Sequence, residues 1–226
     1  MTPDAPATPK PSATVVPLRD APEGLEVLLL QRAKRDGSAT GHWVFPGGKI
    51  EEQDRSTGPD PVLAAARAAA QRETWEEAGL RLASENFGLI SRWITPAMSP
   101  KRFDTWFFAA RVEADAAVRV DGEEIRTHAW FVPENALTAF AEGEIRLVPP
   151  TFVTLSWLAD YADCASALAG LVRESVPKIE PRICPVEGGA YMLYPGDAGY
   201  EDGDLDRPGP RNRVHTQSGR LHYQRT

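Results

Sequence analysis

Residues 60–79 carry signals for both ends of an α-helix, and they restrict the fold more than any other stretch of the chain. Asp60 is a favourable N-cap residue, and Pro61 suits the first helical position because its missing amide hydrogen would have no partner there. The residues that follow are rich in alanine, and Gly79 suits the left-handed position that ends many helices. Strands are predicted on both sides of this helix, which indicates a fold of the mixed α/β class.

The rest of the chain is divided by composition and periodicity. Strands are predicted at residues 12–18, 25–31, 87–94, 105–112 and 128–132. A short helix is expected at residues 136–141, and apolar residues at helical spacing predict a longer helix over residues 151–171. We therefore predict a disordered tail at residues 1–11, one domain at residues 12–180, and an irregular arm at residues 181–226 that packs on the domain or on a partner subunit.

Three glutamates of the predicted helix, Glu73, Glu76 and Glu77, lie at positions i, i+3 and i+4 and therefore project from one face. Like charges at this spacing repel each other by about 0.2–0.5 kcal/mol per pair on an exposed helix. A divalent cation would convert this repulsion into attraction, and Mg²⁺ is commonly held by a few carboxylates together with water and substrate phosphate. A solvated acidic face, with Arg72 paired to Glu76, is the alternative.

The sequence around these glutamates resembles the Nudix box, which has a glycine, five residues, a glutamate, seven residues and then R-E-U-x-E-E-x-G-U, where U is aliphatic. The matching residues are Gly48, Arg72, Glu73, Glu76, Glu77, Gly79 and Leu80. Thr74 stands where an aliphatic residue is usual, and Asp54 stands in place of the first glutamate. The distance from Gly48 to Arg72 is ten residues longer than in the usual box. Extra residues in a loop cost little free energy, so the helical face is expected to survive the insertion.

The resemblance implies a Nudix-type α/β/α sandwich with a mixed central sheet, followed by a C-terminal helix and an extended arm. It also implies an enzyme that hydrolyses a diphosphate bond with Mg²⁺ or Mn²⁺. The cation would be coordinated by Glu73, Glu76, Glu77 and the Gly48 carbonyl, with Arg72 bracing the glutamates. Such a site can polarise a phosphoryl oxygen and activate a water molecule.

A general base is needed as well, and three carboxylates are candidates. They are Glu77 itself and the neighbours Glu123 and Glu124, which precede a predicted strand. In Nudix enzymes a carboxylate just ahead of this strand often approaches the metal, and Glu124 is better spaced for this role. A hairpin turn with solvated acids is the alternative reading of this segment.

Residues 28–48 resemble the signature LLTxRSxxxRxxxGxxxFPGG of coenzyme A pyrophosphatases. The residues in register are Leu28, Leu29, Arg32, Gly41, Phe45, Pro46, Gly47 and Gly48. The second arginine of the signature is Gly37 here, and Lys34 or Arg35 are candidates to replace it. The enlarged box and the segments SPKRFDTWFFAAR and RLVPPTFVTLSWLADY resemble the peroxisomal coenzyme A diphosphatase branch of the superfamily. We therefore expect coenzyme A or acyl-coenzyme A as the substrate, with ADP-ribose or a dinucleotide as the alternative.

The residues predicted to bind substrate are Arg32, Gly47, Gly48, Arg102 and Asp104. Guanidinium groups are apt partners for phosphates, which favours the two arginines. A buried strand with Arg32 at the surface, and a surface ion pair between Arg102 and Asp104, are the alternatives.

Charge and composition limit the kinds of partner that the chain is expected to bind. The net charge of −7 argues against bulk nucleic acid, because binders of DNA or RNA usually carry a basic balance. There is no apolar run of membrane-spanning length, and the N-terminus lacks the apolar segment of a secretory signal. Two cysteines without CxxC spacing favour a reducing, cytoplasmic setting. A small nucleotide-type diphosphate is therefore the expected partner, and a homodimer is possible on the resemblance.

A protein of a different class would be a non-catalytic regulator with the Nudix fold, which binds a nucleotide as a signal. The intact set Glu73, Glu76 and Glu77 argues against it, because sensing alone does not require a cation site.

Overall fold

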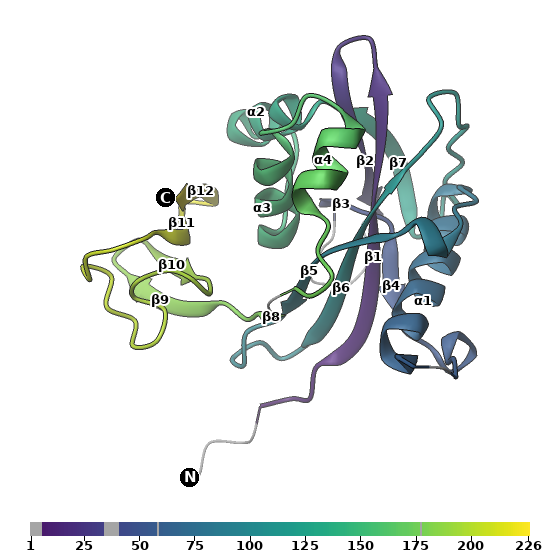
Figure 1. Cartoon of the computed structure of the whole chain (residues 1–226). Coiled ribbons are helices and arrows are strands. Elements are labelled where there is room, and N and C mark those ends of the chain that lie inside the picture. Colours follow the sequence, from purple (N-terminus) through teal and green to yellow (C-terminus); the bar gives the residue numbers. More distant parts are fainter. Residues whose placement is uncertain (1–5, 34–40, 58, 177) are drawn as a thin grey trace. The chain divides into compact units, whose positions relative to one another are not determined.

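The computed structural model describes residues 6–33, 41–57, 59–176 and 178–226, and Figure 1 shows its elements. These residues form two compact units, one of residues 11–90 and 105–176 and one of the remaining described residues. The predicted domain boundary at residue 180 differs from this division, because residues 91–104 group with the C-terminal segment. The predicted tail at residues 1–11 lies in part outside the described residues, and strand β1 already begins at Lys10.

The larger unit is built on a β-sheet in which the strand order is β3-β2-β1-β6-β5, with β4 beside β1 and β7 beside β2. Strand β2 pairs antiparallel with β1, β3 and β7. The end of β5 pairs in parallel with β8 in the smaller unit, so the sheet is mixed, as predicted. The strands are β1 (Lys10–Ala21), β2 (Gly24–Arg32), β3 (Trp43–Val44), β4 (Gly47–Lys49), β5 (Gly88–Ile94), β6 (Phe103–Arg111), β7 (Ile125–Phe131) and β8 (Lys178–Ile179).

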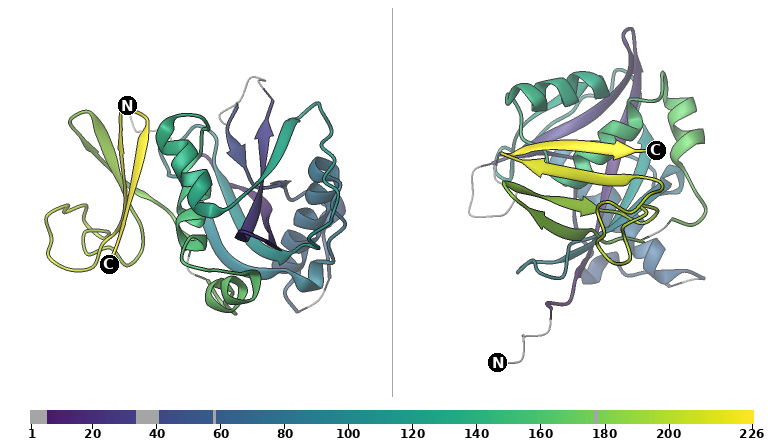
Figure 2. Two further views of the ribbon diagram at one scale, coloured as in Figure 1. Left: turned by 90° about the horizontal axis from the view of Figure 1, so that it is seen from above. Right: turned by 90° about the vertical axis from the view of Figure 1, so that its left-hand side faces the viewer.

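Helices cover both faces of this sheet. Helix α1 lies on one face, and α2, α3 and α4 lie on the other (Figures 1 and 2). The bounds are α1 (Pro61–Ala78), α2 (Pro133–Glu142), α3 (Pro149–Leu158) and α4 (Cys164–Leu171), with short 3₁₀ helices at Glu52–Asp54 and Ser84–Asn86. This arrangement confirms the predicted α/β/α sandwich.

Helix α1 begins and ends where its sequence signals indicate. The Asp60 side chain accepts a hydrogen bond from the Leu63 amide at 3.0 Å, and Gly79 adopts the left-handed conformation with φ of 67°. The Gly79 amide donates to the Trp75 carbonyl at 2.9 Å and closes the last turn. Small side chains on the inner face let the helix approach the sheet closely. They pack against a core that contains Ala13, Val15, Phe87, Leu89 and Phe108.

The region after Pro149 differs from the prediction of one helix over residues 151–171. The structure contains two helices, α3 and α4, in its place. The break has a local cause, because Asp163 and Ser166 form a capping box that starts a new helix. The Cys164 amide also donates to the Asp20 carboxylate at 2.7 Å, which fixes the start of α4 to strand β1.

The C-terminal segment also differs from the prediction of an irregular arm at residues 181–226. It contains four antiparallel strands in the order β12-β11-β10-β9, and its long loop is held by a buried ion pair between Arg213 and Asp197 at 2.6 Å. The strands are β9 (Arg182–Val186), β10 (Gly189–Leu193), β11 (Asn212–Gln217) and β12 (Arg220–Arg225). Packing of this segment on the domain or on a partner subunit stays a prediction.

Two further observations concern the length of the helices and the state of the cysteines. Among the described helices, none combines the length and the apolar character needed to cross a membrane. Cys164 and Cys184 are both free thiols.

Candidate active site

The glycines of strand β4 bring backbone against the acidic face of α1. Gly47 has a φ of 157°, and a Cβ atom there would overlap with the Ala13 carbonyl of the neighbouring strand β1. A Cβ atom on Gly48 would overlap with the carboxylate of Glu73. The Gly47 amide donates to Glu77 Oε2 at 2.9 Å. Glycine is therefore required at Gly47, and a side chain at Gly48 would displace the Glu73 carboxylate from its present position.

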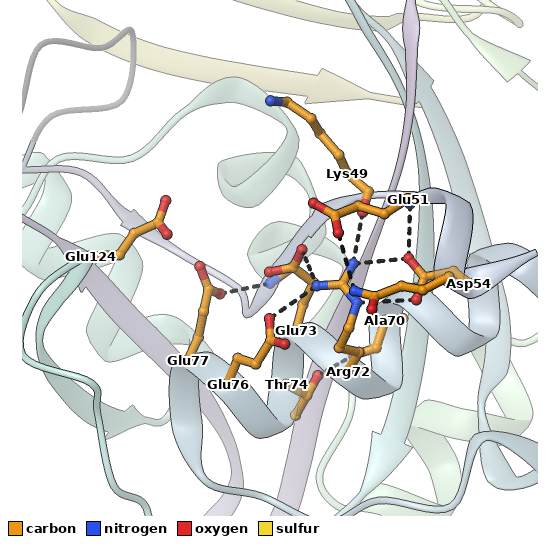
Figure 3. Close-up of polar contacts among 12 residues, drawn as sticks. Lys49, Glu51, Asp54, Ala70, Arg72, Glu73, Thr74, Glu76, Glu77 and Glu124 are labelled. Carbon is orange, nitrogen blue, oxygen red and sulfur yellow. Dashed lines mark hydrogen bonds and ion pairs between the residues drawn. The ribbon is translucent and has the colours of Figure 1, made fainter.

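Arg72 lies at the centre of the polar contacts on this face (Figure 3). Its Nε and Nη2 atoms donate to the two carboxylate oxygens of Asp54 at 3.0 and 2.9 Å. Its Nη1 atom donates to Glu73 at 2.9 Å and to Glu76 at 3.0 Å. Its Nη2 atom also donates to the Lys49 carbonyl at 3.0 Å. One guanidinium thus connects the helix, strand β4 and the loop that contains Asp54.

Asp54 was not among the site residues predicted from the sequence. Its side chain is 4% exposed, and its carboxylate also accepts a hydrogen bond from the Glu51 amide at 2.8 Å. Burial acts to raise the pKa of Asp54, but the hydrogen bonds from Arg72 and Glu51 outweigh it and hold the pKa below its usual range. The ten extra residues therefore lie between Asp54 and Arg72. The sequence feature that could have identified Asp54 as a site residue is its place six positions after Gly48, where the Nudix box has its glutamate.

The three predicted metal ligands differ in burial. Glu77 is 4% exposed, the Glu73 side chain is 16% exposed, and the Glu76 side chain is 53% exposed. The ion pair between Arg72 and Glu76 that we considered as an alternative is present. The face as a whole is not solvated, because Glu73 and Glu77 are turned toward the backbone of strand β4 (Figure 3).

Burial and like charges oppose ionisation of two of these glutamates. Burial raises the pKa of Glu77 to about 8, and the negative charges of Glu73 and Glu124 add to this effect. The Gly47 amide and the positive charge of Arg32 oppose it. Burial likewise raises the pKa of Glu73, against the influence of Arg72. Burial is thus the main cause of both shifts, and the negative charges nearby add to it.

A cluster of carboxylates in such surroundings fits a divalent cation. Carboxylate oxygens are the donors that hard cations prefer, and a cation would relieve the repulsion that now opposes ionisation. In the part of the chain that the structure describes, no three His, Cys, Asp or Glu side chains are already arranged to chelate an ion. The Glu76 carboxylate is held by Arg72 and would have to turn toward the cation.

Two other predicted residues, Arg32 and Glu124, pair with each other at the end of strand β2. Arg32 Nη2 donates to Glu124 Oε1 at 2.6 Å. Both act on the pKa of Glu77, which places them within electrostatic range of the glutamates of α1. Figure 3 shows the Glu124 carboxylate beside that of Glu77.

The family comparison is consistent with this geometry. The family model described as NUDIX domain matches residues 8–150, which is more than half of the chain. The chain belongs to the Nudix family. It is a Nudix hydrolase, as the sequence resemblance predicted.

Three relatives of this Nudix hydrolase have similar sequences over most of the chain. It is 27% identical to the acyl-coenzyme A diphosphatase NUDT19 of Xenopus laevis, over 80% of this chain and 73% of that protein. It is 26% identical to the acyl-coenzyme A diphosphatase NUDT19 of Homo sapiens, over 87% of this chain and 78% of that protein. A crystal structure of a Nudix hydrolase from Alicyclobacillus acidocaldarius matches 74% of this chain and 98% of its own, with a TM-score of 0.65 and 26% identity.

The other predicted substrate-binding residues lie in the smaller unit of this Nudix hydrolase. Arg102 pairs with Glu180 at 2.6 Å, and Asp104 pairs with Arg92 at 2.6 Å, so the two do not pair with each other. Their contact with substrate stays a prediction. The Glu123 amide donates to the Asp121 side chain at 2.9 Å.

Three positions of the coenzyme A signature, Lys34, Arg35 and Gly37, lie outside the described residues. The expectation that one of the two cations replaces the missing arginine therefore stays a prediction.

The raised pKa of Glu77 predicts a pH-dependent stability of the metal-free protein. The folded state holds the Glu77 proton more tightly than the unfolded state does, so this stabilisation is complete below the ordinary pKa of about 4.5. It is lost as the pH rises through about 8. Since one pKa unit corresponds to about 1.4 kcal/mol, the loss is on the order of a few kcal/mol.

Glu77→Gln is expected to abolish most of this pH dependence, because glutamine does not titrate. Urea unfolding with a chelator present, at pH 5 and pH 8, measures the difference. Glu85→Gln, at an exposed position of the same unit, is the control and should keep the wild-type profile. Parallel profiles for wild type and Glu77→Gln would show that burial does not hold the proton.

Proposed function

We propose that this Nudix hydrolase cleaves the diphosphate bond of coenzyme A or acyl-coenzyme A with Mg²⁺ or Mn²⁺. The products would be 3′,5′-ADP and phosphopantetheine or its acylated form. The hydrolytic part of the proposal is supported by one observation above all. The Glu77 carboxylate is buried against the Gly47 amide, the Glu73 carboxylate lies against Gly48, and the charges of Glu73 and Glu124 act on Glu77. The substrate is supported by two relatives named acyl-coenzyme A diphosphatase, which match at least 80% of the chain.

The residues that would hold the cation are Glu73, Glu76, Glu77 and the Gly48 carbonyl. A bound divalent cation withdraws charge from a phosphoryl oxygen and lowers the pKa of a bound water. Arg72 would keep Glu73 and Glu76 in place through its hydrogen bonds to both. Nudix hydrolases generally use divalent metals, and the choice of Mg²⁺ or Mn²⁺ is our proposal.

The proton of the attacking water would pass to a carboxylate of the chain. Glu124 suits this task because its side chain is 58% exposed and therefore open to water, whereas Glu77 is bonded to the Gly47 amide. Arg32 would contact the substrate phosphates, for which a guanidinium offers paired donors. Glu77 remains the second candidate for the base.

A substrate panel tests the specificity. Purified protein would be assayed with coenzyme A, an acyl-coenzyme A, ADP-ribose, NADH and nucleoside triphosphates, with Mg²⁺ and with Mn²⁺. We expect kcat/KM for the coenzyme A substrates to exceed the others by about tenfold or more, which corresponds to about 1.4 kcal/mol of transition-state discrimination. Activity should disappear when a chelator removes the cation. A preference for ADP-ribose or NADH would overturn the assignment of coenzyme A as substrate but not the assignment of the protein as a hydrolase.

A cytoplasmic setting and a homodimer, both expected from the sequence, stay predictions.

A further inference from the structure

The ion pair between Arg32 and Glu124 joins two residues to which the proposed reaction gives separate tasks. It is formed at the edge of the acidic site, with side chains that are 34% and 58% exposed. The backbone supports it, because the Ala33 amide donates to the Glu124 carbonyl at 2.8 Å. The register between β2 and β7 shifts between Gln31 and Arg32, at the position where Arg32 comes opposite Ile125. The Arg32 side chain therefore leaves the end of β2, and the Glu124 side chain leaves the neighbouring residue just before β7.

The backbone of the segment that carries Glu124 is also held by hydrogen bonds to Asp121. Asp121 Oδ1 accepts hydrogen bonds from the amides of Glu123, Glu124 and Ile125 at 2.9, 3.1 and 2.9 Å. The turn is thus fixed by one carboxylate, while the Glu124 side chain is free to change partner without moving the backbone. The backbone position of Glu124 therefore does not depend on which partner its side chain binds.

The pair itself is weak enough to be exchanged. Exposed ion pairs are worth about 0–1 kcal/mol, because water screens them and two long side chains lose freedom. The pair has one charge-assisted hydrogen bond, from Arg32 Nη2 to Glu124 Oε1, whereas a diphosphate can accept two from the same guanidinium. The charge of Glu124 acts on Glu77, so the Glu124 carboxylate, once released, is within electrostatic range of the proposed cation site.

We propose that Arg32 and Glu124 form an exchangeable pair that couples substrate binding to release of the base. Before substrate binds, Arg32 neutralises Glu124 and holds its carboxylate at the edge of the acidic site. The substrate diphosphate takes the guanidinium, and the freed Glu124 carboxylate turns toward the attacking water. This inference rests on the proposed function, since it requires a diphosphate ligand and a carboxylate base.

A double-mutant cycle on ligand binding tests the exchange. The probe is adenosine 5′-diphosphate (ADP) with Mg²⁺. Calorimetry measures its affinity for wild type, Arg32→Ala, Glu124→Gln and the double variant. Glu124→Gln should bind ADP about two- to fivefold more tightly, because Arg32 no longer has a competing partner worth up to about 1 kcal/mol. Arg32→Ala should weaken binding by about tenfold or more. In the Arg32→Ala background, Glu124→Gln should change ADP affinity no further.

Turnover gives a second readout that a purely structural role would not produce. Glu124→Gln should lower kcat while its ligand affinity rises, whereas Arg32→Ala should act mainly on KM and Arg32→Lys should recover part of the loss. Arg111→Ala removes another exposed pair of the larger unit, with Asp20, and serves as the matched control without effect on ADP binding.

Weaker or unchanged ADP binding by Glu124→Gln would overturn the exchange. So would an equal effect of Glu124→Gln in the presence and absence of Arg32. The proposed substrate is tested separately, by the substrate panel on wild type. Failure of coenzyme A as substrate would leave the ADP cycle decisive, because adenosine 5′-diphosphate itself supplies a diphosphate for Arg32 to bind.

Discussion

Glu76→Gln is expected to lower kcat by about 100-fold or more without a measurable loss of stability. The side chain is 53% exposed, and among the described residues its hydrogen bond is the surface one from Arg72, so glutamine can replace it at little cost to the fold. A neutral amide would, however, remove one of the charges proposed to hold the cation. An interaction made by the bound cation with the developing charge of the transition state is commonly worth several kcal/mol. Each 1.4 kcal/mol corresponds to about tenfold in rate.

The measurement is kcat with coenzyme A, together with Mg²⁺ affinity by calorimetry and urea unfolding of the same preparations. Glu85→Gln changes an exposed glutamate outside the site and should keep wild-type values in all three. Full turnover by Glu76→Gln would mean that the acidic stripe of α1 does not carry the reaction. If the wild type bound nucleotide but showed no turnover, the non-catalytic regulator would be the better description.

The contacts that the sequence could predict are local ones. Helix α1 follows from Asp60, Pro61 and Gly79, which act on their own backbone neighbours, and the structure confirms both ends. The spacing of Glu73, Glu76 and Glu77 then follows from the helical period. Thr74, which departs from the aliphatic pattern, also has a local explanation. Its hydroxyl donates to the Ala70 carbonyl at 2.7 Å, so it can be buried in an apolar position.

The contacts that the sequence did not reveal join distant segments. Asp54 and Arg72 meet only because the loop after β4 returns to α1, and Arg32 meets Glu124 only because β2 pairs with β7. The four-stranded sheet at the C-terminus was missed for a related reason. Its strands are short, β11 and β12 are rich in polar residues, and one connection is a long loop that is held by the buried pair Arg213–Asp197. Local periodicity carries little information on such pairing.

Arg72→Met is expected to destabilise the protein by about 3–5 kcal/mol at pH 7, the range typical of a buried ion pair that loses one partner. Methionine retains much of the aliphatic stem but leaves the Asp54 carboxylate, which is 4% exposed, with the Glu51 amide as its remaining hydrogen-bond donor among the described residues. Because Arg72 is what holds the pKa of Asp54 below its usual range, that pKa should rise in the variant. The destabilisation should therefore shrink as the pH falls and Asp54 takes up a proton.

The double variant Arg72→Met/Asp54→Asn distinguishes a specific pair from general disruption of the loop. Asparagine removes the buried charge and keeps acceptor and donor groups of similar shape, so the double variant should regain most of the stability that Arg72→Met loses. Urea unfolding of the four proteins of the cycle in a chelator measures the coupling. Recovery of stability should not restore turnover, because Glu73 and Glu76 would still lack the guanidinium that holds them. Equal losses in the single and double variants would instead show that Arg72 stabilises the fold through its contacts to Lys49 and α1, and that the Asp54 carboxylate is incidental to the site.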